Sequence, residues 1–341
     1  MNRSALWITL LAAVAGAAAL AAETAGLSAE NAGAKAQKGQ WVNISDALVA
    51  KLAGEGAKPG YAGPTAGIAV DRASGNVFLV INDQGLYRSG DRGATWARCD
   101  DKAVGGRCET GFGIDADPAG SGIALFMVYG SSAVTLDGGK TWAKSKLSHI
   151  DAVSAEWPAA KALIAFRHES GGTIALSQDG AQTWKDLGKG FKGVGLFDAR
   201  TLVATKEKEG GIFRSTDGGE NWSRASDLAP SGLAMRTFRG AGYWVSDAGL
   251  LVSKDKGATW AVQGSPLKMV QGPYFGKDES HIVVLTKEGF QETTDGGKTW
   301  NVAAPLPPDC TADRMTTCAW DVKANLFYVS RMTKPAYKFE R

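Results

Sequence analysis

Short strand-like runs follow one another along this chain, with only turn residues between them. In one stretch the runs are Gly67–Asp71, Val77–Ile81, Gly85–Arg88 and Thr95–Arg98. Short runs of apolar and β-branched residues bounded by Gly, Asp and Asn are typical of antiparallel strands joined by hairpins. The pattern therefore predicts an all-β chain built from a repeated unit of four strands.

One octapeptide marks the last turn of each unit. It reads Ser/Thr-x-Asp-x-Gly/Ala-x-Thr/Asn-Trp and returns about every 40 residues. A fixed period of this size, with several strands per unit, is the signature of a β-propeller. The six copies are residues 89–96, 135–142, 177–184, 215–222, 253–260 and 293–300.

Each position of the octapeptide has a physical role in a tight hairpin. The Asp carboxylate can accept hydrogen bonds from backbone N–H groups of the turn. Glycine at the fifth position adopts a positive φ at little cost, and the one copy with Ala181 there must carry strain or use another turn. The Trp begins the outer strand and buries a large ring between sheets.

The six copies resemble the Asp-box, or BNR, repeats of sialidases, sortilin-type receptors and photosystem II assembly factors. In that family the boxes lie at the blade periphery, away from the functional face, so the resemblance implies a structural role for the box residues. In size and layout the chain looks most like the photosystem II assembly factor branch, which implies a scaffold or assembly chaperone. The box residues are Asp91, Trp96, Asp137, Trp142, Asp179, Trp184, Asp217, Trp222, Asp255, Trp260, Asp295 and Trp300.

The C-terminal end supplies three strand-like runs and no box. At the other end of the chain, Gln40–Ile44 looks like each outer strand that follows a box, with Trp41 in the place of the box Trp. We therefore expect a single seven-bladed β-propeller over residues 39–341, whose last blade the N-terminal strand completes. Such closure removes an exposed sheet edge. Residues 45–52 read as a short helix with Ser45 as its N-cap.

Residues 1–21 have the pattern of a secretory signal: Arg3, an apolar run and small residues up to Ala21. Residues 22–38 are then expected to be a flexible segment, and the mature protein to be periplasmic or secreted and not membrane-embedded. The formal net charge is +3, with acidic and basic residues interspersed. Nothing in this pattern resembles a nucleic-acid-binding stripe.

The four cysteines fall in two close pairs, Cys99 with Cys108 and Cys310 with Cys318. In an oxidising compartment each pair predicts a local disulfide. The spacing is not that of a Cys-x-x-Cys metal site, and the three histidines are scattered along the chain. We therefore expect no metal and no other cofactor.

Propellers bind ligands at the axis, on the face formed by the second-to-third strand connections and the connections between blades. The boxes lie on the opposite face. Polar residues of these connections, together with aromatic and basic residues of the inner strands, are therefore the candidate binding residues. They are Asp83, Gln84, Trp157, His168, Glu169, Lys206, Glu207, Arg236, Asp247, Tyr274, Lys287, Trp320 and Arg331.

Mixed charge with aromatics on one face fits a polar ligand, a peptide or a glycan. The resemblance to photosystem II assembly factors implies an extracytoplasmic, non-enzymatic scaffold that presents this axial face to a protein partner. The alternative is a glycoside hydrolase of the sialidase-like superfamily, or a glycan-binding protein. Sialidases of the Asp-box family carry an arginine on the first inner strand, whereas the matching stretch here, residues 66–71, has none. No catalytic residue is assigned, and a two-carboxylate hydrolase using Asp83, Glu169, Glu207 or Asp247 stays open.

Overall fold

The computed structural model describes residues 38–58, 60, 63–108, 110–120, 124–126, 129–157, 159 and 161–341. The expected signal, residues 1–21, lies outside the described residues, as do residues 22–37 of the expected flexible segment. Within the described residues the strands form seven four-stranded antiparallel sheets and one two-stranded sheet.

The four-stranded sheets are numbered here from 1 to 7 by the chain position of their innermost strands. Sheet 1 consists of β2 (Thr65–Val70), β3 (Val77–Ile81), β4 (Gly85–Ser89) and β5 (Ala97–Arg98). Sheet 2 consists of β7 (Ile114–Ala116), β8 (Ala124–Phe126), β10 (Ala133–Thr135) and β11 (Ala143–Lys144). Sheet 3 consists of β12 (Ala152–Ala155), β13 (Leu163–Arg167), β14 (Thr173–Ser177) and β15 (Lys185–Asp186). The two-stranded sheet joins β6 (Gly105–Arg107) to β9 (Tyr129–Ser131).

The remaining sheets follow the same order from the centre outward. Sheet 4 consists of β16 (Phe191–Leu196), β17 (Leu202–Lys206), β18 (Ile212–Ser215) and β19 (Ser223–Ser226). Sheet 5 consists of β20 (Arg236–Phe238), β21 (Ala241–Val245), β22 (Leu250–Ser253) and β23 (Ala261–Gln263). Sheet 6 consists of β24 (Gln271–Phe275), β25 (Ile282–Thr286), β26 (Gly289–Thr293) and β27 (Asn301–Ala304). Sheet 7 is β28 (Thr316–Asp321), β29 (Leu326–Arg331), β30 (Tyr337–Glu340) and β1 (Trp41–Asn43).

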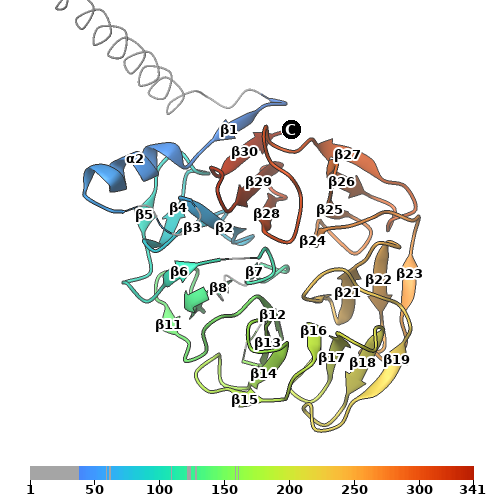
Figure 1. The fold of residues 1–341 in the computed structure, drawn as a ribbon. Coiled ribbons are helices and arrows are strands. Elements are labelled where there is room, and N and C mark those ends of the chain that lie inside the picture. The colour runs from blue at the N-terminus through green and yellow to red at the C-terminus, as the bar shows by residue number, and fades with distance from the viewer. Residues whose placement is uncertain are drawn as a thin grey trace, which may run out of the picture.

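The sheets stand around a central axis, with the first strand of each sheet facing the centre and the last at the rim (Figure 1). This arrangement confirms the predicted all-β propeller. Apolar side chains fill the space between neighbouring sheets: Phe166 and Ile174 of sheet 3 pack with Leu196 and Leu202 of sheet 4 in one buried cluster. Full burial of such a side chain contributes about 1.5–3 kcal/mol, so these inter-sheet layers are the main source of stability.

The N-terminal strand β1 lies at the outer edge of sheet 7, beside the C-terminal strand β30 (Figure 1). Trp41 is opposite Phe339 in the register, and their ring centroids are 5.2 Å apart. The Trp41 indole N–H donates to the carbonyl of Pro305, after β27 of sheet 6, at 3.1 Å. The box residue Trp96 makes the same kind of contact, because its indole donates to the carbonyl of Ile44 in the neighbouring sheet at 2.8 Å.

The box turns are held by the Asp carboxylate. In the copy at Asp255, one oxygen accepts the Ser253 hydroxyl at 2.8 Å and the Thr259 N–H at 2.9 Å. The other oxygen accepts the Thr259 hydroxyl at 2.6 Å. Equivalent contacts recur in the other five copies, with Asn221 in place of Thr in one of them. The Ser/Thr, Asp and Thr/Asn positions of the pattern thus form one local hydrogen-bond network.

Ala181 keeps the turn that glycine makes in the other boxes, at the cost of strain. Its φ is +70°, and it is fully buried. Its N–H donates to the Ser177 hydroxyl at 2.9 Å, as Gly257 donates to Ser253 at 2.8 Å. The first of the two sequence-based alternatives is therefore correct: the same turn forms, and the methyl group carries the steric cost of a left-handed backbone.

The expected disulfides are not present in the structure, which corrects the prediction for both cysteine pairs. The sulfur atoms are directed to separate hydrogen-bond partners. Cys108 Sγ donates to the Thr110 carbonyl at 2.9 Å, and Cys318 Sγ lies 3.0 Å from the Tyr274 hydroxyl of the neighbouring sheet. Burial raises the pKa of Cys318 and of Cys99 to about 12, so both are protonated thiols at neutral pH.

The helix α2 (Asp46–Gly54) follows β1 and packs its buried residue Leu48 against sheets 1 and 7. Its start agrees with the expected N-cap position, although the side chain that accepts from the Ser45 and Asp46 N–H groups is Asn43, at 3.0 and 3.1 Å. Within the described part of the chain, no helix has the length and apolar character needed to span a membrane.

Candidate functional site

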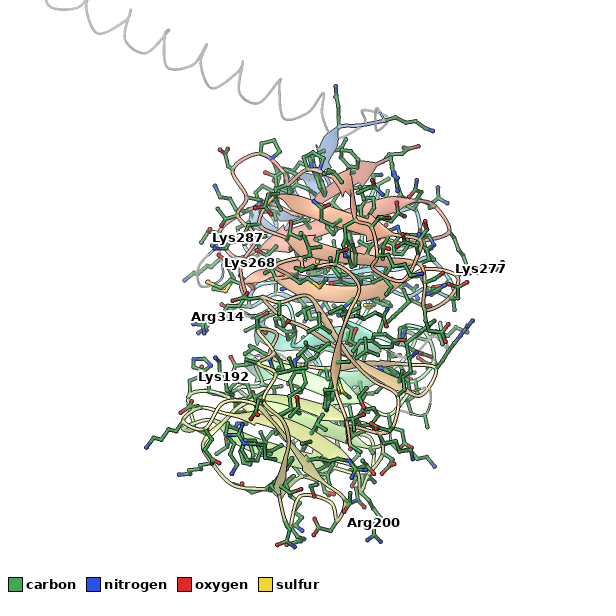
Figure 2. The ribbon with its side chains drawn as sticks, turned by 90° about the vertical axis from the view of Figure 1, so that its right-hand side faces the viewer. Lys192, Arg200, Lys268, Lys277, Lys287 and Arg314 are labelled. Atoms are coloured by element: carbon green, nitrogen blue, oxygen red, sulfur yellow. The ribbon has the colours of Figure 1, made fainter. Side chains whose placement is uncertain are left out.

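The two ends of the central axis differ because every sheet has the same strand order. The second-to-third strand connections and those leading into each inner strand gather at one end, which we call the open end. The boxes and the first-to-second strand connections gather at the other, the closed end. Lys192, Lys268, Lys287 and Arg314 project from one side of the molecule and Lys277 from the other, while Arg200 projects at the lower end of the view (Figure 2).

A cavity of about 560 Å³ lies at the open end of the axis. Its polar lining is Thr110, Asp151, His168, Lys192, Glu207 and Arg314. Its apolar lining is Phe166, Leu233, Met315 and Met332. These residues come from sheets 2 to 5 and 7, so the cavity exists only where the inner ends of several sheets meet. Concave sites with an apolar wall and a few convergent polar groups are the usual places for ligand binding.

Four exposed cations lie at the open end: Lys192 and Arg314 on the cavity wall, with Lys268 and Lys287 beyond it (Figure 2). Among the described residues, none of the four forms an ion pair. Other cations of this end are already paired, because Lys206 Nζ lies 2.9 Å from Glu209 and Arg331 Nη2 lies 2.8 Å from Asp313. The unpaired cations therefore make this end suited to an anionic partner.

Asp151 and His168 of the cavity wall form a compact cluster with the neighbouring Glu169. Asp151 is buried, and its two oxygens accept the His168 backbone N–H at 2.7 Å and face the His168 Nδ1 at 2.7 Å. Glu169 Oε2 lies 3.3 Å from the same Nδ1. Burial raises the pKa of Asp151, and the hydrogen bonds from His168 oppose that rise. Among the described residues, this is the group of three side chains with donor atoms close enough to hold a metal ion.

The structure brings together part of the predicted face. The second-to-third strand connections carry Asp83, Gln84, His168, Glu169, Glu207, Asp247 and Lys287, with Lys206 and Arg331 ending β17 and β29. Of these, His168 and Glu207 line the cavity. Gln84 is used locally, since its side-chain N–H donates to the carbonyl of Lys58 at 3.0 Å. Lys206 is held over the Phe213 ring at 4.3 Å.

Four of the predicted binding residues lie at the closed end. This corrects the expectation that they share the open end with the second-to-third strand connections. Trp157 follows β12, at the first-to-second strand connection of sheet 3. Arg236, Tyr274 and Trp320 line a cavity of about 60 Å³ together with Arg72 and Asp117. The inner strands run through the axis from one end to the other, and these side chains leave them near the far end.

The closed end is held by a buried polar network. Arg236 forms a bidentate contact with Asp115, at 3.1 and 3.2 Å, and its guanidinium lies 4.5 Å from the Tyr274 ring centroid. The Tyr274 hydroxyl donates to the Cys318 carbonyl at 2.6 Å. Arg72 donates to the carbonyls of Pro118 at 2.9 Å and Phe275 at 2.6 Å. These contacts join sheets 1, 2, 5, 6 and 7 across the axis.

Sequence reasoning missed several residues of the open end, among them Asp151, Lys192 and Arg314. Asp151 and Arg314 lie in connections that lead into an inner strand, whereas Lys192 is the second residue of the inner strand β16. The sequence-based prediction favoured the second-to-third strand connections instead. A signal for Asp151 was available. β12 and β13 are antiparallel neighbours in the chain, with Ala152 opposite Phe166. Asp151, just before β12, and His168, just after β13, therefore lie at the same end of the sheet.

Comparisons with known proteins agree with the fold. The BNR/Asp-box repeat model matches residues 213–224. No curated protein matches the chain. The structure of YCF48 bound to D1 peptide is similar, with a TM-score of 0.50 and 13% identity over 82% of this chain and 93% of that one. YCF48 from Cyanidioschyzon merolae gives a TM-score of 0.48 and 15% identity over 88% of this chain and 98% of that one.

An ancestral GH74 enzyme is also similar, with a TM-score of 0.50 and 14% identity. The match covers 82% of this chain but 45% of that enzyme, so the chain spans less than half of the enzyme's length. At these identities the likeness shows a shared β-propeller fold. A shared fold does not by itself imply a shared function.

Proposed function

We propose that this protein is a non-enzymatic binding scaffold whose open end holds a carboxylate-rich segment of a protein partner. The observation that carries the proposal is the axial cavity of about 560 Å³ with the unpaired cations Lys192 and Arg314 on its wall. A cavity of this size accommodates several side chains, and exposed cations that form no ion pair among the described residues attract and orient an anionic partner. The similar YCF48 structure, whose title names a bound D1 peptide, is consistent with a peptide partner.

The scaffold is proposed to be a seven-bladed ring closed by the N-terminal strand. The pairing of Trp41 with Phe339 and the seven four-stranded sheets of the described residues support this. In such a ring each sheet ends at the rim in a short outer strand, and the last sheet has a fourth strand like the others, which suits a rigid platform. The leader-like residues 1–21 support an extracytoplasmic location, periplasmic or secreted.

The test uses charge reversal at the open end. Binding of fluorescent peptides rich in Asp and Glu is measured by anisotropy against Asn/Gln-substituted versions of the same peptides. The double variant Lys192→Glu with Arg314→Glu should lose at least about tenfold in affinity, because reversed charges meet the acidic peptide in the cavity. The matched control reverses Lys140 and Lys298, exposed residues of two boxes at the closed end.

Equal affinity for acidic and neutral peptides would contradict the proposal. So would an equal loss in the Lys140→Glu/Lys298→Glu control, since binding would then reflect net charge and not the open end. Lys206 is a poor probe, despite its place on the same face, because Glu209 already neutralises it.

A glycoside hydrolase is the second candidate, favoured by the presence of Asp151 and Glu207 on the wall of one cavity. Hydrolysis by two carboxylates requires one of them as a general acid and the other as base or nucleophile. Release of reducing sugar from a polysaccharide panel, lost in Glu207→Gln, would support this function over the scaffold. Absence of release, together with acidic-peptide binding, would support the scaffold.

A further inference from the structure

The Asp151, His168 and Glu169 cluster at the open end has a geometry that peptide binding does not require. Asp151 ends the connection into β12, and His168 with Glu169 begins the connection from β13 to β14. The antiparallel pairing of these strands brings the three side chains to one point. One donor atom from each of them lies within 4.8 Å of the others.

We propose that this cluster is a zinc site. One imidazole nitrogen with two carboxylate oxygens is a ligand set that Zn²⁺ accepts, at bond lengths of about 2.0–2.2 Å. In tetrahedral geometry such bonds place neighbouring donor atoms about 3.3–3.5 Å apart. The 3.3 Å from His168 Nδ1 to Glu169 Oε2 already has this value, and the 2.7 Å to Asp151 Oδ1 must widen by about half an ångström.

The cluster has a fixed member and two adjustable ones, which makes this widening possible. Asp151 has 5% of its side chain exposed, and its Oδ2 is anchored by the His168 backbone N–H at 2.7 Å. That bond leaves Oδ1 as the oxygen presented to the ion and serves as an outer-shell contact that orients the ligand. His168 and Glu169 are 50% and 35% exposed, so their rings and chains can move.

The second, independent observation is the cavity. Asp151 and His168 both form its wall, so the fourth coordination position would open into about 560 Å³ that also contains Lys192 and Arg314. Zinc sites with three protein ligands and one open position bind water or an oxygen of a second molecule there. The site would thus add an oxygen-binding point to the open end, with a carboxylate or carbonyl oxygen as the class of ligand it takes.

A second imidazole–carboxylate pair provides the matched control. His281 Nε2 lies 2.8 Å from Glu292 Oε1, nearly the distance of the Asp151–His168 pair. Glu292 is also paired with Arg341, so a cation stands where the proposed site has its second carboxylate. This pair has the hydrogen bond without the third ligand, and zinc affinity should therefore not depend on it.

The experiment is calorimetric titration of ZnCl₂ into the untagged full chain at pH 7.5, with no peptide present. The wild-type protein should bind about one equivalent with micromolar or tighter affinity. His168→Ala and Glu169→Gln should each weaken binding by at least about tenfold, and His281→Ala should leave it unchanged. Circular dichroism checks that each variant is folded. His168 and Glu169 are chosen because their exposed side chains can be replaced with little effect on folding, whereas Asp151 is buried.

Three results would overturn the proposal: no zinc binding by the wild-type chain, undiminished binding in His168→Ala, or an equal loss in His281→Ala. Binding of Ca²⁺ with no binding of Zn²⁺ would also overturn it, because an all-oxygen preference excludes the imidazole as a ligand. Since the titration contains no peptide, failure of the acidic-peptide proposal and failure of the zinc proposal are read separately.

Discussion

The two ends of the central axis are built from the same strands, yet one is filled and the other is hollow. At the closed end, Arg236, Asp115 and Tyr274 satisfy one another, and about 60 Å³ of space remains. At the open end, about 560 Å³ remains, and Lys192 and Arg314 form no ion pair among the described residues. Polar groups that are mutually paired hold sheets together, whereas unpaired polar groups at a cavity are available to a partner.

The largest expected effect comes from breaking the buried ion pair of the closed end. Asp115→Asn removes the charge that compensates Arg236, whose side chain is 10% exposed. Loss of one partner from a buried pair costs about 3–5 kcal/mol, because the other charge stays buried and unpaired. The free energy of unfolding from urea denaturation measures this cost.

The matched change at the open end is Asp313→Asn. Asp313 is 40% exposed and pairs with Arg331 at 2.8 Å, a similar contact in more solvent. The expected loss is below about 1 kcal/mol. Equal losses of unfolding free energy in Asp115→Asn and Asp313→Asn would show that the ion pair of the closed end contributes no more to stability than the exposed pair of the open end.

A smaller effect is expected from Tyr274→Phe, which removes the hydroxyl that donates to the Cys318 carbonyl. Burial raises the pKa of Tyr274 well above its usual value, so the hydroxyl is a neutral donor throughout the physiological range. A buried carbonyl left without its donor costs about 1–2 kcal/mol of unfolding free energy. Affinity for acidic peptide should stay at the wild-type value, and a loss of affinity would mean that the closed end takes part in binding.

The smallest expected effect on stability at neutral pH comes from the boxes of the closed end. Their contribution to stability changes measurably only at acid pH. Hydrogen bonds from Thr183, Asn221 and Thr259 lower the pKa values of Asp179, Asp217 and Asp255 to about 2. The unfolded-state pKa of Asp is about 3.9. Stability from these carboxylates is therefore present above pH about 4 and is lost as the pH falls toward 2.

The melting temperature measured from pH 6 to pH 2.5 checks this dependence. Asp255→Asn should reduce the fall in melting temperature between pH 6 and pH 2.5, because an amide in the box does not titrate. Asp247→Asn, an exposed change at the open end, should keep the wild-type slope. A steeper slope in Asp255→Asn would be inconsistent with a lowered pKa in the folded state.

The boxes were predictable because everything they need lies within eight residues. Asp255 is bound by Ser253 and Thr259, and the spacing of these residues fixes the turn wherever it occurs. At Ala181 the sequence left strain or a different turn open, and the structure shows that the contacts of Ser177 and Asp179 outweigh the strain of one left-handed alanine. The disulfides failed as a prediction because closeness in sequence does not determine the direction of the two sulfur atoms.

The sequence by itself determined the all-β propeller and the chemistry of its turns, because a repeat of local hydrogen bonds and apolar runs specifies each unit independently. Only the tertiary structure decided which side chains meet at the axis. Arg236 and Tyr274 leave their strands toward the closed end, while Asp151 and His168 meet at the open one, although the sequence placed Arg236, Tyr274 and His168 on one face. That outcome depends on strand length and on where each inner strand ends, and these become fixed when the neighbouring sheets pack against one another.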